Sequence, residues 1–118
     1  MITADALLKK HSGHQDTALP DADLASWLAA LDGWALQDGR LVKTYAFKDY
    51  YRTMAFVNAI AWLSHAEDHH PDLTVGYNRC VVNYRTHSVN GGQGGLSEND
   101  FICAAKVDAL ALQAPGVR

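Results

Sequence analysis

The chain has 118 residues, 48% of them hydrophobic, and a formal net charge of −3 at pH 7. This length fits one ordinary domain. The net charge and the lack of any Lys or Arg run exclude the basic surface that direct binding to nucleic acid or to an anionic membrane requires. No apolar stretch approaches the length of a membrane span, so we expect a soluble protein.

The cysteines point to a reducing compartment. Cys80 and Cys103 are the two cysteines; they lie far apart and form no Cys-x-x-Cys pair, as is usual for reduced thiols, and a single disulfide between them stays open. The first residues place their charges after a short apolar run, which is not the order of a signal peptide. We therefore expect a cytoplasmic protein.

Residues 1–19 show no sustained hydrophobic period, and we expect a weakly ordered N-terminal arm there, with His11 and His14 at its surface. Residues 20–118 are expected to form a single domain. After Pro20, Asp21 can cap a helix that ends at Gly33. Its apolar face consists of Leu24, Trp27, Leu28 and Leu31.

A hairpin is predicted next. Residues 34–37 and 40–47 flank Asp38-Gly39, a dipeptide that tolerates the positive φ angles of a two-residue type I′ turn. Asp49 can then cap a long second helix, whose apolar residues recur at helical spacing. Pro71 disfavours helix at the residue before it, so His70 should lie at the exit of this helix.

Two further strands are predicted from alternating side chains, at residues 73–77 and 80–87, with a tight turn around Asn78. The glycine-rich residues 91–95 fit neither a P-loop nor a dinucleotide fingerprint and are expected to be a flexible connection. Ser97 and Asp100 resemble a capping box for a third helix, ended by Pro115-Gly116. Its expected apolar face is Ile102, Ala105, Ala109 and Leu112.

The predicted order is therefore α-β-β-α-β-β-α, with no parallel crossover between strands. We expect an α+β fold: a four-stranded antiparallel sheet with the helices packed on one face. The other face of the sheet is then free to meet solvent or a second subunit.

Titratable side chains crowd the predicted end of the second helix: His65, Glu67, Asp68, His69 and His70. Such crowding is costly unless the groups are solvated or used, and histidine titrates near neutral pH, where acid–base catalysts work.

A metal site is the nearest competing chemistry. His65 and His69, if both are helical, share a face and could bind an ion together with Glu67 or His87. We favour a site without metal, because neither His-Glu-x-x-His nor the Pro-Cys-x-x-Cys partner of the zinc deaminases is present.

The spacing of these residues resembles the signature of the pterin-4a-carbinolamine dehydratases. His65 is followed after three residues by His69-His70-Pro71, and Tyr77, His87 and Asp100 then come at family spacing. The resemblance also includes Gly33-Trp34, Phe47-Lys48-Asp49 and the Gly-Leu-Ser-Glu at residues 95–98, and spans roughly residues 20 to 112.

The resemblance implies dehydration of 4a-hydroxytetrahydropterin to the quinonoid dihydropterin, which recycles the cofactor of aromatic amino acid hydroxylases. The pterin is then the substrate, and no further cofactor is implied. Loss of the hydroxyl from C4a needs a proton donor to the leaving oxygen and removal of the N5 proton, and imidazoles can fill both roles.

The same resemblance implies the roles of individual residues. His69 matches the principal acid–base histidine and His87 the second, with their roles interchangeable, while His70 matches a histidine that contacts the pterin. Asp68 and Thr86 match residues that border it.

Two further binding candidates depart from the pattern: His65 stands where many relatives have Glu, and Leu73 where an aromatic residue is common. The loop at residues 91–95 lengthens the interval from His87 to Asp100. A capping role is sufficient to explain Asp100, and a role in the site stays open.

A binding protein is the alternative from another class. Some animal relatives are also dimerisation cofactors of a homeodomain transcription factor, so a non-catalytic cofactor or pterin-binding role is open. The resemblance further implies a homodimer or homotetramer and a functional link to an aromatic amino acid hydroxylase.

Overall fold

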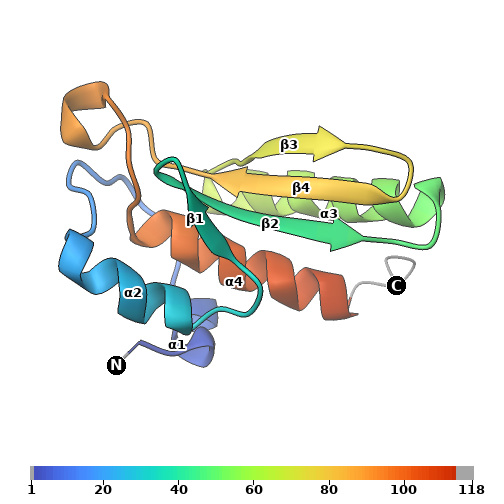
Figure 1. The fold of residues 1–118 in the computed structure, drawn as a ribbon, viewed down its shortest axis with the longest axis horizontal. Coiled ribbons are helices and arrows are strands. Elements are labelled where there is room, and N and C mark those ends of the chain that lie inside the picture. The colour runs from blue at the N-terminus through green and yellow to red at the C-terminus, as the bar shows by residue number, and fades with distance from the viewer. Residues whose placement is uncertain (1, 114–118) are drawn as a thin grey trace.

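The computed structural model describes residues 2–113 and has the predicted α+β architecture, with helices packed on one face of a four-stranded antiparallel sheet (Figure 1). The helices are α1 (Ala4–Lys9), α2 (Asp21–Ala29), α3 (Tyr50–Glu67) and α4 (Glu98–Gln113), and a short 3₁₀ turn, η1, spans Asn90–Gly92. The strands are β1 (Ala35–Gln37), β2 (Arg40–Ala46), β3 (Asp72–Val75) and β4 (Arg79–Tyr84).

The sheet has the order β1-β2-β4-β3, and each neighbouring pair is antiparallel. Asp38 and Gly39 join β1 to β2 with φ angles of 51° and 74°, which confirms the predicted type I′ turn. The inward residues of the two central strands are largely buried, as the period-2 alternation requires. They include Leu41, Tyr45, Cys80, Val82 and Tyr84.

The second hairpin sets the geometry near the histidines. β3 and β4 pair so that Asp72 lies opposite Asn83, and the Gly76 amide donates to the Arg79 carbonyl (2.8 Å) across the tight turn. Both strands are shorter than predicted: β3 ends at Val75, before the turn, and β4 ends at Tyr84, one residue past its last pair with β3. Thr86 pairs instead with Gly95, in an isolated bridge that closes the glycine-rich loop.

Helix α3 begins as predicted, with the Asp49 carboxylate accepting from the Arg52 amide (2.9 Å). It ends at Glu67, because Asp68 adopts the left-handed conformation (φ 51°, ψ 41°). His69 and His70 therefore lie at the helix exit. His69 is outside the helix, so the shared helical face that we considered for His65 and His69 does not exist.

Helix α4 has the predicted capping box: the Ser97 hydroxyl accepts from the Asn99 amide (3.2 Å), and the Asp100 carboxylate accepts from the Ser97 amide (2.9 Å). The predicted apolar face was too narrow. Phe101, Ala104 and Val107 are buried as well, because α1, α2 and α3 pack around this helix. Leu112, at 61% exposure, lies outside the core, and Pro115-Gly116 lies beyond the described residues.

The N-terminal segment differs from the expected weakly ordered arm. Thr3 caps helix α1, and Leu7 is completely buried against α4. The helix has six residues, less than two turns, so no hydrophobic period could reveal it in the sequence. His11 and His14 are exposed, as predicted. Asp21 begins α2 as its first residue, and Pro20 holds the cap position without a side-chain bond.

No helix in residues 2–113 combines the length and the apolar character needed to span a bilayer.

Candidate active site

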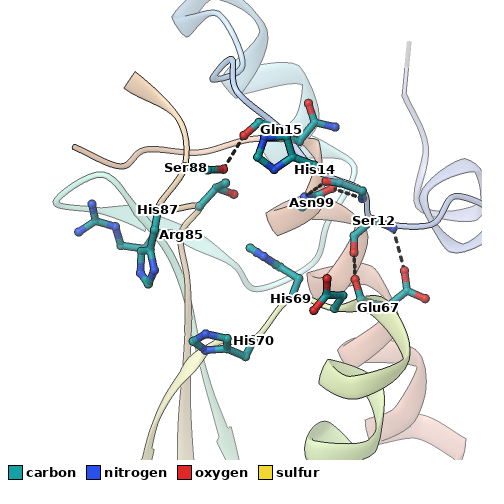
Figure 2. A pocket seen from close by; sticks show the side chains of 13 residues that line it. Ser12, His14, Gln15, Glu67, His69, His70, Arg85, His87, Ser88 and Asn99 are labelled. Atoms are coloured by element: carbon teal, nitrogen blue, oxygen red, sulfur yellow. Dashed lines mark hydrogen bonds between the residues drawn. The ribbon is translucent and has the colours of Figure 1, made fainter. Parts of the chain in front are cut away.

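At one end of the sheet α3 ends, β3 begins, β4 ends and α4 begins (Figure 1). A cavity of about 310 Å³ opens there (Figure 2). Three short segments and one helix residue line it: residues 12–15, 67–70 and 85–88, together with Asn99. Four stretches that are distant in sequence thus meet at one opening.

Five of the seven residues singled out from the sequence line this cavity: Asp68, His69, His70, Thr86 and His87. The other two do not. His65 is exposed on the last turn of α3, and the reversal at Asp68 carries the chain away from it. Leu73 pairs with Val82, and its half-buried side chain packs against the core. The family resemblance predicted both residues at the rim of the pocket, whereas neither lines the cavity in the structure.

The backbone at Asp68 aims His69 into the site. The His69 amide donates to the Ser64 carbonyl (3.2 Å) and the Asp68 amide to the His65 carbonyl (3.4 Å), the pair of bonds that closes a helix in a Schellman motif. This motif needs a left-handed residue, which aspartate tolerates better than most side chains. The helix end therefore fixes the direction in which His69 leaves α3.

Asp100 holds His69 from behind. The Nε2 atom of His69 lies 2.7 Å from Oδ1 of Asp100, and the two side chains are 12% and 0% exposed. The other carboxylate oxygen accepts from the Thr86 hydroxyl (2.8 Å) and the Ser97 amide (2.9 Å). With a carboxylate at Nε2, the proton of a neutral His69 belongs on Nε2, which leaves Nδ1 as the basic nitrogen.

Asp100 is thus the residue whose role the sequence left open. Its spacing from Ser97 explained it fully as a helix cap, and the structure shows that it contacts His69 as well. A signal was present, because Asp100 also stood at the end of the histidine pattern. The pairing itself joins residues 31 positions apart, which only the fold brings together.

Thr86 lines the cavity, but its hydroxyl is directed to Asp100. It is 5% exposed, and its hydroxyl lies 2.6 Å from the Ser97 hydroxyl in addition to its bond to Asp100. Both polar contacts are internal to the protein. The ring of His69 stacks on Tyr84 at 5.6 Å and 12°, which further limits its rotation.

His70 and His87 form a second, more open pair. Their ring centroids are 6.2 Å apart and the rings are nearly perpendicular, at 72°. His70 precedes β3 and His87 follows β4, so the antiparallel pairing of these strands brings both to the same end of the sheet. Both side chains are exposed to solvent, in contrast to His69.

The glycine-rich loop is shaped by Arg85. The Arg85 guanidinium donates to the Gln93 carbonyl (2.6 Å), and a Cβ atom on Gly94 would overlap that guanidinium. Gly94 also has a φ of 91°, a conformation that disfavours any other residue. The loop thus has a specific conformation next to His87.

The metal ligands considered from the sequence do not converge. Within residues 2–113 there is no group of three His, Cys, Asp or Glu side chains arranged to hold an ion. Glu67 turns to Lys106 and His11, at 3.1 Å each, and Asp100 already contacts Nε2 of His69.

The chain also matches known proteins. The family model described as "Pterin 4 alpha carbinolamine dehydratase" matches residues 17–110. The chain belongs to this family. A relative from Bdellovibrio bacteriovorus is 59% identical over 111 residues, covering 94% of this chain and 92% of the relative. One from Stenotrophomonas maltophilia is 56% identical over 117 residues, covering 98% and 95%. Both are named "putative pterin-4-alpha-carbinolamine dehydratase".

Two solved structures are similar in fold to this member of the dehydratase family. One, described as a transcriptional coactivator/pterin dehydratase from Brucella melitensis, has a TM-score of 0.73 and 32% identity, and the match covers 80% of this chain and 99% of that one. The other, described as a pterin dehydratase-like RuBisCO assembly factor of the alpha-carboxysome, has a TM-score of 0.51 and 30% identity, covering 66% and 86%.

Proposed function

We propose that the protein dehydrates 4a-hydroxytetrahydropterin to the quinonoid dihydropterin by histidine acid–base catalysis. The observation that carries the proposal is the buried Asp100 carboxylate against His69, in a cavity that His69 shares with His70 and His87. Such a pair prepares an imidazole for proton transfer, as a carboxylate behind a catalytic histidine does in hydrolases.

The reaction needs two proton transfers. The bond from C4a to its hydroxyl breaks, the oxygen takes a proton and leaves as water, and the N5 proton is removed as the C4a–N5 double bond forms. We assign the removal of the N5 proton to Nδ1 of His69. The resulting imidazolium is stabilised by the Asp100 carboxylate, which costs no rearrangement because it already lies 2.7 Å away.

His87 is then the proton donor to the leaving hydroxyl. Its exposure suits this role, since an acid that loses its proton in each turnover must regain one from solvent. His70, whose ring is nearly perpendicular to that of His87, contacts the pterin ring, and Asp68, which also lines the cavity, borders it. The product re-enters the pool of pterin cofactor used by aromatic amino acid hydroxylases.

The test follows the loss of 4a-hydroxypterin absorbance. His69→Ala should lower kcat by about 10²–10⁴-fold, the usual contribution of a general acid or base. Asn58→Ala, at an exposed position of α3, is the control and should retain wild-type kcat. Full activity in a folded His69→Ala protein would refute the mechanism.

A role without catalysis is the competing proposal, since the Brucella structure is also described as a coactivator. Binding alone would not require a carboxylate buried behind His69. Absence of turnover by the wild-type chain, with tight pterin binding retained, would favour the binding role.

A further inference from the structure

One wall of the cavity comes from the N-terminal segment, residues 11–16, which we call the N-terminal wall. Its residues 12–15 line the cavity. The family model matches residues 17–110, so this wall lies before the matched segment. In Figure 2, His14 and Gln15 lie across the opening from His69 and His70.

Glu67 anchors the wall to the end of α3. Its carboxylate, 5% exposed, accepts from the Ser12 amide (2.9 Å) and from Lys106 (3.1 Å), and His11 contacts it at 3.1 Å. The Ser12 hydroxyl also donates to the Glu67 carbonyl. Glu67 is two residues before His69, so this anchor ties the wall to the segment that carries the base.

Two more residues close in sequence to the proposed site residues hold the wall by hydrogen bonds. The Asn99 side chain makes a pair of bonds with Gly13, accepting from its amide (3.1 Å) and donating to its carbonyl (2.5 Å). The Ser88 hydroxyl donates to the Gln15 carbonyl (2.5 Å). Asn99 precedes Asp100, and Ser88 follows His87. The N-terminal wall is therefore bonded to residues next to, or two positions from, His69, His87 and Asp100, the three groups to which the mechanism assigns a proton or a charge.

We infer that the N-terminal wall is a specificity element, in which His14 binds the polar substituent at C6 of the pterin. The inference rests on the proposed function, because it takes the pterin to be oriented by His69 and His87. C6 is bonded to N5, so a substituent there starts one bond from the atom that His69 deprotonates.

The exposed fractions of the side chains on the two sides of the cavity indicate which part of the substrate contacts the N-terminal wall. His69 and Asp100 are 12% and 0% exposed, whereas His14 and Asp16 are 74% and 81% exposed. The reacting ring belongs with the buried pair, and a flexible polar substituent belongs at the solvent side. Nε2 of His14 lies 2.6 Å from the Asp16 carboxylate, which orients the ring, and an imidazole and a carboxylate are both hydrogen-bond partners for hydroxyl groups.

The experiment compares two substrates, 4a-hydroxytetrahydropterins with a dihydroxypropyl or a methyl group at C6. His14→Ala should raise KM for the dihydroxypropyl substrate about tenfold, the loss of about 1.4 kcal/mol, and leave its kcat and the methyl substrate's KM within twofold. Asn99→Ala, which releases Gly13, should give the same pattern and faster amide hydrogen exchange in residues 11–15. Asn58→Ala is the control for both.

Equal KM changes for the two substrates, or none, would overturn the inference. Calorimetric binding of the corresponding 7,8-dihydropterins separates it from the proposed function. If the wild type binds both without turnover, catalysis fails, and a selective loss of dihydroxypropyl binding in His14→Ala still supports the wall. If the wild type neither binds these pterins nor turns over either substrate, both proposals fall.

Discussion

The substitution Asp100→Asn removes the negative charge behind His69 but keeps the size of the side chain and one oxygen. That oxygen can still accept from the Ser97 amide and the Thr86 hydroxyl, as one carboxylate oxygen does now. The amide nitrogen then faces Nε2 of His69, so two N–H groups meet unless the histidine proton moves to Nδ1. In that tautomer Nδ1 cannot take the N5 proton.

The expected loss can be worked from this contact. A hydrogen bond to a charged group contributes about 1.5–3 kcal/mol, and about 1.4 kcal/mol is a factor of ten in rate. We therefore expect kcat to fall about 10- to 100-fold, measured by the loss of 4a-hydroxypterin absorbance, with KM changed much less because the carboxylate contacts His69 rather than substrate.

Asp108→Asn is the matched control. Asp108 lies on the same helix and accepts from the Trp34 indole (3.0 Å), from Lys43 (2.8 Å) and from the Tyr45 hydroxyl, away from the cavity. It should lose stability in urea titrations and retain kcat. Wild-type kcat in folded Asp100→Asn would refute the assignment of His69 as the base.

Three other predictions concern stability and reactivity. Asp68→Gly should retain or slightly raise Tm, whereas Asp68→Val should lower the free energy of unfolding by about 1–2 kcal/mol in thermal scans, because the left-handed conformation disfavours a β-branched side chain. Burial raises the pKa of Cys80 to about 11 and that of Cys103 to about 12, so neither thiol should react with iodoacetamide at pH 8 until the protein is unfolded; rapid labelling of the native protein would contradict this. Burial raises the pKa of Glu67, but hydrogen bonds from Ser12, Lys106 and His11 hold it below its ordinary value of 4.5. The charged Glu67 carboxylate therefore stabilises the fold fully above pH 4.5, and this stabilisation is lost as the pH falls through the lower pKa of the folded protein. In urea titrations at acid pH, the difference in unfolding free energy between wild type and Glu67→Gln should therefore shrink.

The sequence predicted those parts of the fold that depend on neighbouring residues. Asp38-Gly39 specifies its turn through local φ preferences, and Pro71 disfavours helix at His70, which lies beyond the end of α3 at Glu67. The same local logic predicted the capping box at Ser97. These features follow from a few adjacent side chains, so their signal is present in the sequence itself.

The parts that the sequence missed depend on distant pairings. The contact of Asp100 with His69 and the bonds of the N-terminal wall to Glu67 and Asn99 join segments that only the folded chain brings together. His65 was assigned to the site by its position in a pattern, and the left-handed turn at Asp68 sends the chain elsewhere. One backbone conformation thus decides which histidines share the cavity.

The β3–β4 hairpin makes the turn at residues 76–78 a remote determinant of the distance between His70 and His87. His70 and His87 sit at the open end of this hairpin, and the register that pairs Asp72 with Asn83 determines how far apart they lie. A strand advances about 3.4 Å per residue, and a slip of one residue turns each side chain to the opposite face. A single insertion in the turn would therefore separate the two imidazoles without touching the cavity. Variation in turn length among natural homologues should be correspondingly rare, although none of residues 76–78 lines the cavity.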